Sequence, residues 1–204
     1  MKPEIHLIQV DENTHVSSIW LIPEHYRKIL IIAHGAGKDM NSPFVSALHE
    51  GLANHNILTV KFKFPYLEQG RKAPDRPAML LSTWRAIVNA GMDKTGMPAE
   101  KIFLSGKSMG GRYASMLATE SPNFGGVILY GYPLHPPGKP DKPRFDHIPA
   151  ITCPLLFIQG TRDNLCRLGG FKKLIDELPA KPFLQIIEGG EHSFKVLKRL
   201  GRDE

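Results

Sequence analysis

The chain has 204 residues, of which 42% are hydrophobic and 23% are charged. These proportions are typical of one globular domain with a sizeable core, and they exclude fibrous, collagenous and disordered chains. The apolar runs, such as residues 29–33 and 127–130, fall far short of the roughly 20 residues of a membrane span, and the first residues are too polar for a signal peptide. We therefore expect a cytoplasmic protein with one domain over residues 1–204 and no membrane association.

Charge and cysteine usage limit the partners that we expect. The net charge is +6, and most of the excess lies in residues 101–204, which hold 15 Lys or Arg against 10 acids. The densest basic stretch, residues 195–202, lacks the interleaved aromatic side chains of a protein that binds single-stranded nucleic acid, so we expect no nucleic-acid partner. Cys153 and Cys166 cannot form a disulfide framework, and no Cys/His cluster has zinc-ligand spacing. We expect reduced thiols, no metal and no cofactor.

Short apolar runs alternate with helical periods along the chain. Eight runs indicate buried strands, and they cover residues 5–10, 16–22, 28–33, 57–64, 102–104, 126–130, 155–159 and 183–187. Five segments have apolar residues three and four apart, as helices do, and they cover residues 42–55, 77–91, 109–120, 168–178 and 193–200. This alternation predicts an α/β fold, with a mostly parallel sheet of about eight strands and helices on both faces. The first two strands have no helical segment between them, so we expect them to pair antiparallel.

Residues 132–149 interrupt this alternation. They contain six prolines and no apolar period. A loop of this length inside a compact domain is typically functional or disordered. It is too short and too rich in proline to form a helical cap, so we expect no large cap domain.

A strand, a Gly-x-Ser-x-Gly motif and a helix follow one another in residues 101–112. The motif consists of Gly106, Ser108 and Gly110, and it is the pattern of a nucleophile elbow. In so tight a turn the serine backbone is strained, and the residues two before and two after it must be small. The turn lifts the Ser108 hydroxyl above the sheet edge, where the Met109 amide at the helix start is expected to stabilise an oxyanion. Ser108 is therefore the candidate nucleophile.

Residues 106–108 also match the end of a second motif, the phosphate-binding loop with the pattern Gly-x-x-x-x-Gly-Lys-Ser. Its first glycine would stand at position 101, which is occupied by Lys101. The strand also leads straight to Gly106, without a loop long enough to wrap a phosphate in backbone amides. A plain glycine-rich turn between strand and helix is the other alternative to the elbow.

A serine hydroxyl needs an imidazole to accept its proton, and the imidazole needs a carboxylate to fix its tautomer. Asp163 follows the seventh run and His192 follows the eighth, just before a predicted helix. The chain order Ser, Asp, His is that of α/β-hydrolases, and the carboxyl ends of parallel strands meet at one edge of a sheet. We predict the triad Ser108, Asp163 and His192. The sequence leaves open His135 and His147 as the base, and Asp146 and Glu191 as the acid.

The loop after the third strand is expected to supply a second oxyanion donor. It reads Ala33-His-Gly-Ala-Gly37, and such small residues let a backbone amide approach a reacting carbonyl. We nominate the amide of Ala36, with that of Gly37 as the alternative. His34 is expected to be a structural residue that is turned into the loop.

Several strings of the chain are similar to those of a known family, namely His34-Gly-Ala-Gly, Phe64-Pro-Tyr, Gly70-Arg71, Pro74-Asp-Arg76, Gly106-Lys-Ser-Met-Gly-Gly-Arg112, Gly131-Tyr-Pro-Leu-His-Pro-Pro-Gly-Lys-Pro140 and Gln159-Gly-Thr-Arg-Asp163. Through them nearly the whole chain resembles the α/β-hydrolases, specifically a small family related to dienelactone hydrolases, and the hydrolase-like domains of testis-expressed protein 30 and of NSL complex subunit 3. The resemblance implies an α/β-hydrolase fold and the triad Ser108, Asp163 and His192. Dienelactone hydrolases have a cysteine nucleophile, whereas this chain has a serine. The segment Asp163-Asn-Leu-Cys166 also differs from the Asp-Pro-Phe-Gly of the family.

These residues favour a serine hydrolase of the carboxylesterase or thioesterase type, which cleaves a small-molecule ester or thioester through an acyl-enzyme. The alternative from a different class is a non-catalytic module of the same fold that binds a protein or a ligand. The intact set of nucleophile, acid and base favours catalysis over binding alone. The basic residues that are candidates for favouring an acidic substrate are Arg112, Arg71, Lys72 and Arg76.

Overall fold

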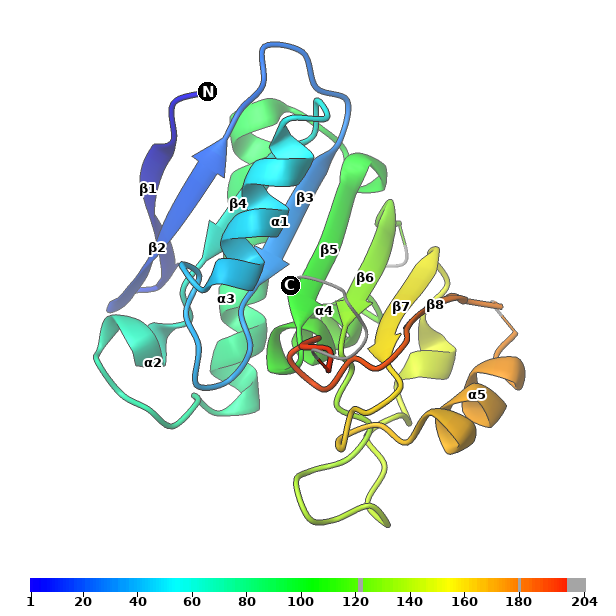
Figure 1. The fold of residues 1–204 in the computed structure, drawn as a ribbon. Helices are drawn as coiled ribbons and strands as arrows, with labels where there is room; N and C mark the ends of the chain where they lie inside the picture. Colours follow the sequence, from blue (N-terminus) through cyan, green and yellow to red (C-terminus); the bar gives the residue numbers. More distant parts are fainter. Residues whose placement is uncertain (121–122, 180, 198–204) are drawn as a thin grey trace.

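One sheet organises the computed structural model, which describes residues 1–120, 123–179 and 181–197 of the chain (Figure 1). Its eight strands are β1 (Glu4–Asp11), β2 (Thr14–Leu21), β3 (Ile29–Ala33), β4 (Leu58–Phe62), β5 (Ile102–Lys107), β6 (Gly126–Tyr130), β7 (Leu155–Gly160) and β8 (Phe183–Ile187). Their order across the sheet is β1-β2-β4-β3-β5-β6-β7-β8. The predicted α/β class with eight strands is confirmed.

The sheet is mostly parallel, as predicted. Every neighbouring pair among β3 to β8 is parallel, and β1 pairs antiparallel with β2. β2 also pairs antiparallel with β4, which the sequence analysis did not anticipate. Residues 22–28 between β2 and β3 form a loop without a helix, and they are too few for the crossover that a parallel connection needs. The carboxyl ends of the parallel strands meet at the lower edge in Figure 1.

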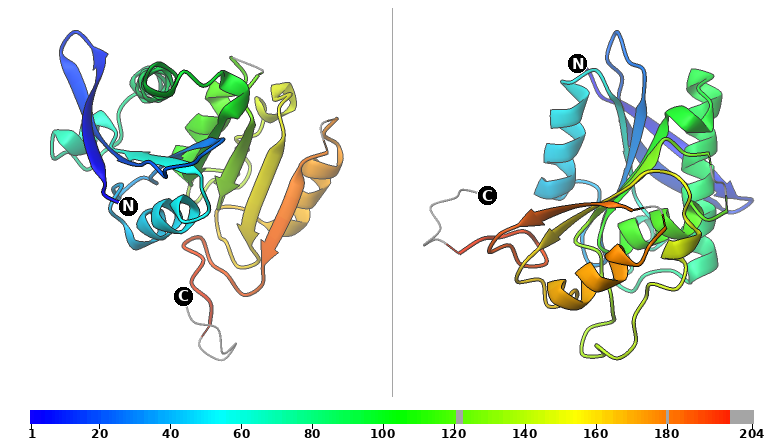
Figure 2. Two further views of the ribbon diagram at one scale, coloured as in Figure 1. Left: turned by 90° about the horizontal axis from the view of Figure 1, so that it is seen from above. Right: turned by 90° about the vertical axis from the view of Figure 1, so that its right-hand side faces the viewer.

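Helices cover both faces of the sheet, as predicted (Figure 2). α1 (Pro43–Ala53) lies on one face, and α3 (Pro77–Thr95) and α4 (Met109–Leu117) lie on the other. α5 (Leu168–Asp176) packs into the same core as α3 and α4, and the short α2 (Pro65–Glu68) contacts β2. Two 3-10 turns, η1 (Ala99–Lys101) and η2 (Ile148–Ala150), complete the helical elements of the described residues. None of the described helices is long and apolar enough to cross a membrane.

β3 shows how the sheet separates two cores. Ile29, Ile31 and Ala33 belong to the larger core, which α3, α4 and α5 cover. Leu30 and Ile32 belong to a smaller core beneath α1. Successive side chains of a strand point to opposite faces, so the continuous apolar run of β3 is that of a central strand buried on both sides. The loops at its end and at the end of its neighbour β5 therefore rest on a rigid support.

The helix predicted over residues 193–200 is wrong for the part that the structure describes. Residues 193–197 contain no helix, and residues 198–200 lie outside the described residues. Phe194 has φ of 68°, a left-handed conformation that an α-helix does not accommodate. Its ring packs against Phe44 at a centroid distance of 5.6 Å. The helical spacing of apolar residues here thus reflects a packed loop.

The proline-rich loop over residues 132–149 is anchored near both ends. Tyr132 and Phe145 are buried in the larger core, and the Tyr132 hydroxyl donates a hydrogen bond of 2.5 Å to the carbonyl oxygen of Arg144. Residues 137–143 between them are exposed. The loop projects beyond the carboxyl ends of the strands in Figure 1. The described residues form no large cap domain, as predicted.

Candidate active site

Ser108 lies between β5 and α4 in a strained backbone conformation. Its φ is 52° and its ψ is −115°, a combination that residues with a side chain rarely adopt. A Cβ atom at Gly106 would lie 2.5 Å from the carbonyl carbon of Gly110, and one at Gly110 would lie 2.5 Å from the carbonyl oxygen of His34. The turn therefore requires glycine on both sides of Ser108, and it presents the serine at the carboxyl end of β5.

Three side chains from three loops form a hydrogen-bonded chain at this turn. Nε2 of His192 lies 2.9 Å from Oγ of Ser108, and Nδ1 of His192 lies 2.8 Å from Oδ2 of Asp163. Because a carboxylate oxygen can only accept, Nδ1 carries the proton, and Nε2 is free to accept the proton of the serine hydroxyl. The structure thus brings together the three residues of the predicted triad, in the order of donors and acceptors that activates a serine.

The carboxylate of Asp163 is buried and held by several donors. Its side chain has 0% exposure, and Oδ2 also accepts a hydrogen bond of 2.6 Å from Nε2 of Gln159. Oδ1 accepts one of 2.8 Å from the Leu165 amide, while the Tyr132 amide holds Oε1 of Gln159 at 2.9 Å. These bonds satisfy lone pairs that burial would leave unpaired, and they fix the carboxylate in the orientation that His192 meets.

Gln159 and Lys107 are site residues that the sequence analysis missed. Gln159 stands at the end of β7, four residues before Asp163, and a buried polar residue at a strand end is the signal that marks it. Lys107 precedes the nucleophile directly, where the motif accepts any residue. Its role follows only from its contacts in three dimensions.

The ammonium of Lys107 ties the loop that carries His192 to the end of β5. It donates a hydrogen bond to the backbone carbonyl oxygen of His192, and it lies 5.0 Å from the centre of the Phe194 ring. Burial lowers the pKa of Lys107 to about 8, while the charge of Asp163 acts in the opposite direction. Gly131, at φ of 57°, leaves room for the ammonium, because a Cβ atom there would lie 2.6 Å from Nζ.

The alternative acids and bases make other contacts. Nε2 of His147 lies 2.8 Å from Oγ of Ser115, and burial lowers the pKa of His147 to about 4. Nδ1 of His135 contacts a neighbouring backbone carbonyl at 3.0 Å. Glu191 accepts a hydrogen bond of 2.7 Å from a nearby serine hydroxyl, and Asp146 is exposed. Among the described histidines, His192 is the one that contacts the hydroxyl of the candidate nucleophile.

His34 is fully buried and joins two loops. Its Nδ1 donates to the carbonyl oxygen of Gly35 at 2.9 Å, and its Nε2 accepts from the Phe64 amide at 3.2 Å. These two partners define a neutral ring with the proton on Nδ1, and burial lowers the pKa of His34. His34 therefore acts as a brace between the loop after β3 and the segment after β4, with neither nitrogen left for catalysis.

The loop after β3 lies against the nucleophile. A Cβ atom at Gly35 would lie 3.5 Å from Cβ of Ser108. The Ala36 amide has no backbone acceptor among the residues that the structure describes. Burial raises the pKa of the neighbouring Tyr66 hydroxyl, and this hydroxyl has no hydrogen-bond partner among the described residues. The Gly37 amide also has no backbone acceptor among these residues, so Ala36 and Gly37 both stay candidate partners of the Met109 amide, which lies in the first turn of α4 and has no helical acceptor there.

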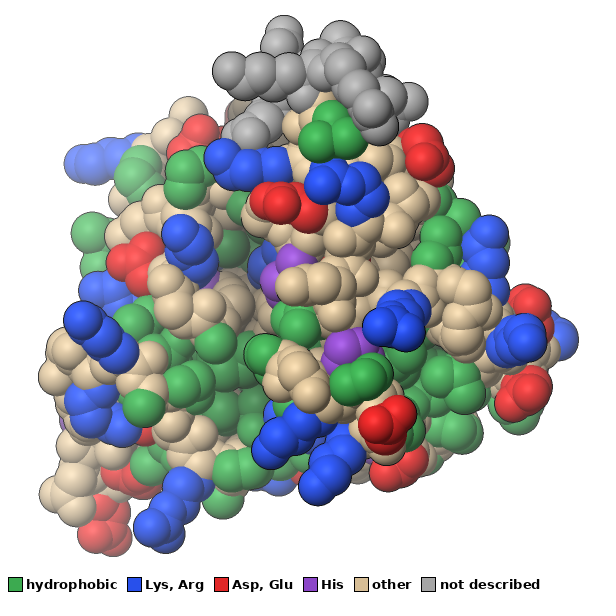
Figure 3. Space-filling view, turned by 60° about the horizontal axis from the view of Figure 1, so that its bottom comes forward, with side chains coloured by type: hydrophobic (Ala, Val, Ile, Leu, Met, Phe, Trp, Pro, Cys, Tyr) green, Lys and Arg blue, Asp and Glu red, His purple; other side chains and the backbone are tan. Residues whose placement is uncertain are grey.

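Hydrophobic and neutral surface lies at this edge of the sheet, with both basic and acidic side chains around it (Figure 3). Arg71 forms an ion pair with Asp75, so its charge is already matched. Lys72 and Arg76 are exposed. Nε of Arg112 is buried without a hydrogen-bond partner in the described part of the chain. Of the basic residues predicted to favour an acidic substrate, Arg112 is thus the one with a buried polar atom that lacks a hydrogen bond.

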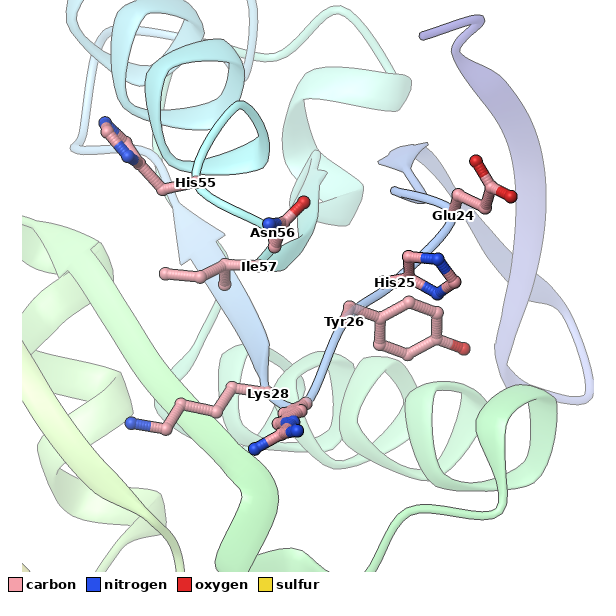
Figure 4. Close-up of a pocket in the computed structure, with 8 residues that line it drawn as sticks. Glu24, His25, Tyr26, Lys28, His55, Asn56 and Ile57 are labelled. Atoms are coloured by element: carbon pink, nitrogen blue, oxygen red, sulfur yellow. The ribbon is translucent and has the colours of Figure 1, made fainter.

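A pocket of about 780 Å³ lies at the other end of the sheet (Figure 4). It is lined by residues 24–28, which precede β3, and by residues 55–57, which precede β4. β3 is parallel to both β4 and β5, so these segments and Ser108 stand at opposite ends of the strands. This pocket is therefore separate from the candidate active site.

The family described as "Alpha/beta hydrolase domain" matches residues 26–204. The chain belongs to this α/β-hydrolase family. The matched range includes Ser108, Asp163 and His192. The finer resemblance to testis-expressed protein 30 and to NSL complex subunit 3 stays a prediction.

Solved structures from three bacteria show the same fold. An alpha-beta serine hydrolase homologue from Coxiella burnetii has a TM-score of 0.79 at 19% identity, over 94% of this chain and 90% of that chain. A dienelactone hydrolase from Anabaena variabilis has a TM-score of 0.77 at 21% identity, over 96% and 90%. An α/β serine hydrolase without a lid from Xanthomonas campestris has a TM-score of 0.75 at 18% identity, over 95% and 87%. At these identities the likeness concerns the fold.

Proposed function

We propose that the chain is a serine hydrolase of the carboxylesterase or thioesterase type, which cleaves a small-molecule ester or thioester. The proposal rests on the continuous hydrogen-bonded chain from Asp163 through His192 to Ser108, with heavy-atom distances of 2.8 Å and 2.9 Å. A hydroxyl in such a chain transfers its proton to the imidazole as it attacks a carbonyl carbon. The solved relatives described as serine hydrolases support the same chemistry.

In the first half of the reaction, Oγ of Ser108 attacks the carbonyl carbon and its proton passes to Nε2 of His192. The imidazolium is stabilised by the carboxylate of Asp163. Negative charge develops on the former carbonyl oxygen, where the amides of Met109 and Ala36 donate to it. The tetrahedral intermediate then breaks its bond to the alcohol or thiol, which takes the proton from Nε2 and leaves an ester of Ser108.

In the second half, water replaces the departed alcohol or thiol. His192 accepts a proton from this water as its oxygen attacks the acyl carbon, and the same two amides stabilise the second tetrahedral intermediate. The bond between Oγ and the acyl carbon breaks, and the proton returns from Nε2 to Oγ. The products are a carboxylic acid and the regenerated serine. No large cap covers the site in the part of the chain that the structure describes, which suits a small substrate.

A binding module of the same fold is the competing proposal. Binding alone requires neither the φ of 52° at Ser108 nor a serine hydroxyl at 2.9 Å from an imidazole. Strain of this kind costs on the order of 1–3 kcal/mol, and it persists where the surrounding structure enforces it. The strained serine and the oriented histidine therefore favour catalysis.

Labelling with a fluorophosphonate tests the proposal. The purified chain is treated with the reagent, and the modified peptide is located by mass spectrometry. We expect stoichiometric labelling on Ser108, because the activated oxygen attacks the phosphorus and expels fluoride. The His192→Ala variant should lose this labelling while it stays folded by circular dichroism.

His147→Ala is the matched control, since His147 is also a partly buried histidine that contacts a serine hydroxyl. This variant should label like the wild type. A folded wild-type chain that does not react at Ser108 would sink the hydrolase proposal and favour the binding module. Labelling that is unchanged in His192→Ala would show that His192 is not the base.

A further inference from the structure

A second pocket lies between the N-terminal strands and α1, away from the candidate active site. Its volume is about 440 Å³, within the range of pockets that hold small ligands. None of its lining residues belongs to the triad or to the loop after β3. The lining residues are Met1, Pro3, Ile5, Ile19, Leu21, His49, Glu50, Ala53, Asn54 and Lys61.

Two polar side chains in this pocket are buried and poorly partnered. His49 is 2% exposed, and neither of its ring nitrogens has a hydrogen-bond partner among the described residues. Lys61 is 5% exposed, and its Nζ donates to Oγ of Ser46 at 3.0 Å. Buried polar side chains are nearly always hydrogen-bonded, so a histidine with two unpaired nitrogens in a pocket wall indicates a missing partner.

Among the residues that the structure describes, no carboxylate forms an ion pair with Lys61. Glu50 lines the same pocket and is exposed, and Glu50 and Asp39 act on Lys61 only from a distance. Burial lowers the pKa of Lys61, and burial together with Lys61 lowers the pKa of His49 to about 4. A buried ammonium with one neutral hydrogen bond is destabilising unless an anion completes its coordination.

Apolar side chains form much of the rest of the pocket wall, beside Glu50 and Asn54. Ile19 and Leu21 of β2 line it from the sheet, and Met1 and Ile5 line it from the N-terminal segment. Met1 and Ile5 are 59% and 75% exposed, two of the large hydrophobic residues that the described surface leaves open. A ligand with an apolar body would cover these two side chains, and their removal from water would contribute to its binding free energy.

We propose that this pocket binds a small amphipathic monocarboxylate. Its carboxylate accepts hydrogen bonds from Nζ of Lys61 and from an N–H of the His49 ring, and its apolar body lies against Ile5, Ile19 and Leu21. The single buried ammonium and the nearby Glu50 favour one negative charge on the ligand. This site does not depend on the hydrolase proposal, because it shares no residue with the candidate triad.

Octanoate is the probe, and isothermal titration calorimetry measures its binding. We expect octanoate to bind the wild-type chain, and Lys61→Met and His49→Phe to weaken that binding by about tenfold or more, as expected from the loss of one charge-assisted hydrogen bond. Lys63→Met is the matched control, since Lys63 lies two residues further on and does not line the pocket. Octanol and octylamine, which have the same apolar body, should bind at least about tenfold more weakly.

Octanoate also resembles the product of an esterase, so the site of binding must be located. The ring signals of His49, assigned by comparison with His49→Phe, should shift during an NMR titration of both the wild type and Ser108→Ala. This readout remains available if Lys61→Met fails to fold. Any one of three results would overturn the proposal: equal binding of octanoate and octanol, unchanged binding to folded Lys61→Met, or His49 signals that do not move.

Discussion

His192 and His49 differ in what their ring nitrogens contact. The side chain of His192 is 28% exposed, and its nitrogens contact Asp163 and Ser108. His49 is 2% exposed, and neither of its nitrogens has a partner in the described part of the chain. The histidine with better access to water thus has the fuller set of protein contacts.

This difference shows two ways of preparing a polar site. Around His192 the protein supplies every partner, down to Gln159 behind the carboxylate of Asp163, so the site is organised before a substrate arrives. Around His49 and Lys61 the protein leaves hydrogen-bonding capacity unused, and a molecule from outside is needed to complete it. Removing one of the interacting side chains should therefore strongly reduce activity in the first region. In the second region it should leave the free energy of unfolding nearly unchanged or raise it.

The largest expected effect comes from Asp163→Asn. The amide side chain no longer selects the imidazole tautomer with its proton on Nδ1, so kcat/KM for p-nitrophenyl acetate should fall by about 10⁴-fold. Asp146→Asn is the control, because Asp146 is exposed in the proline-rich loop, and its rate should equal that of the wild type. A loss smaller than about tenfold in Asp163→Asn would contradict the proposed role of Asp163.

Lys107→Met should reduce kcat by about tenfold, because the loop that carries His192 loses its tie to β5 and the imidazole is less well placed. The pH profile separates this effect from simple destabilisation. Since the pKa of Lys107 is lowered to about 8, the wild-type rate should decline above about pH 8, where the ammonium becomes a neutral amine and its hydrogen bond to the His192 carbonyl is weakened by the loss of the positive charge. The variant should lack this decline. If the rates of the wild type and the variant decline equally at alkaline pH, the proposed role of Lys107 is refuted.

His49→Phe should raise the free energy of unfolding by about 1 kcal/mol at pH 7, because it removes an unpaired buried imidazole. The difference in the free energy of unfolding between His49→Phe and the wild type should increase as the pH falls. The pKa of His49 is about 4 in the folded state and about 6.5 when unfolded, so between these values the unfolded wild-type chain binds the extra proton and stability falls as pH falls.

Urea unfolding at several pH values between 7 and 4 measures this effect. His147, whose pKa is also lowered to about 4, is present in both proteins and cancels in the difference. A constant difference across this pH range would show that His49 is not kept neutral by its surroundings.

The smallest effect is expected outside both regions, at Arg71. Its ion pair with Asp75 involves an Arg side chain that is 46% exposed, and such pairs contribute about 0.5 kcal/mol or less. Arg71→Ala should leave KM unchanged for both neutral and anionic esters, because its charge is already matched. A selective rise in KM for the anionic ester would show that Arg71 contacts substrate.

Much of the fold and of the candidate site was predictable from local patterns. The strands are short apolar runs, and the elbow needs glycines at fixed offsets from Ser108. The helix predicted after His192 is absent from residues 193–197, because the spacing of apolar residues does not reveal the left-handed φ of Phe194. Lys107 was missed as a site residue because its partner, the carbonyl oxygen of His192, is 85 residues away in the chain.

The sequence by itself determined the alternation of strands and helices, the sharp turn at Ser108, and the order of the serine, the acid and the histidine. These features depend on backbone preferences and residue chemistry over a few neighbouring positions. Only the tertiary structure distinguished His192 from His135 and His147, and only it brought His49 and Lys61 into one pocket. The reason is that hydrogen-bond partners are set by the packing of segments that lie far apart in the chain, and a linear pattern carries no distances between them.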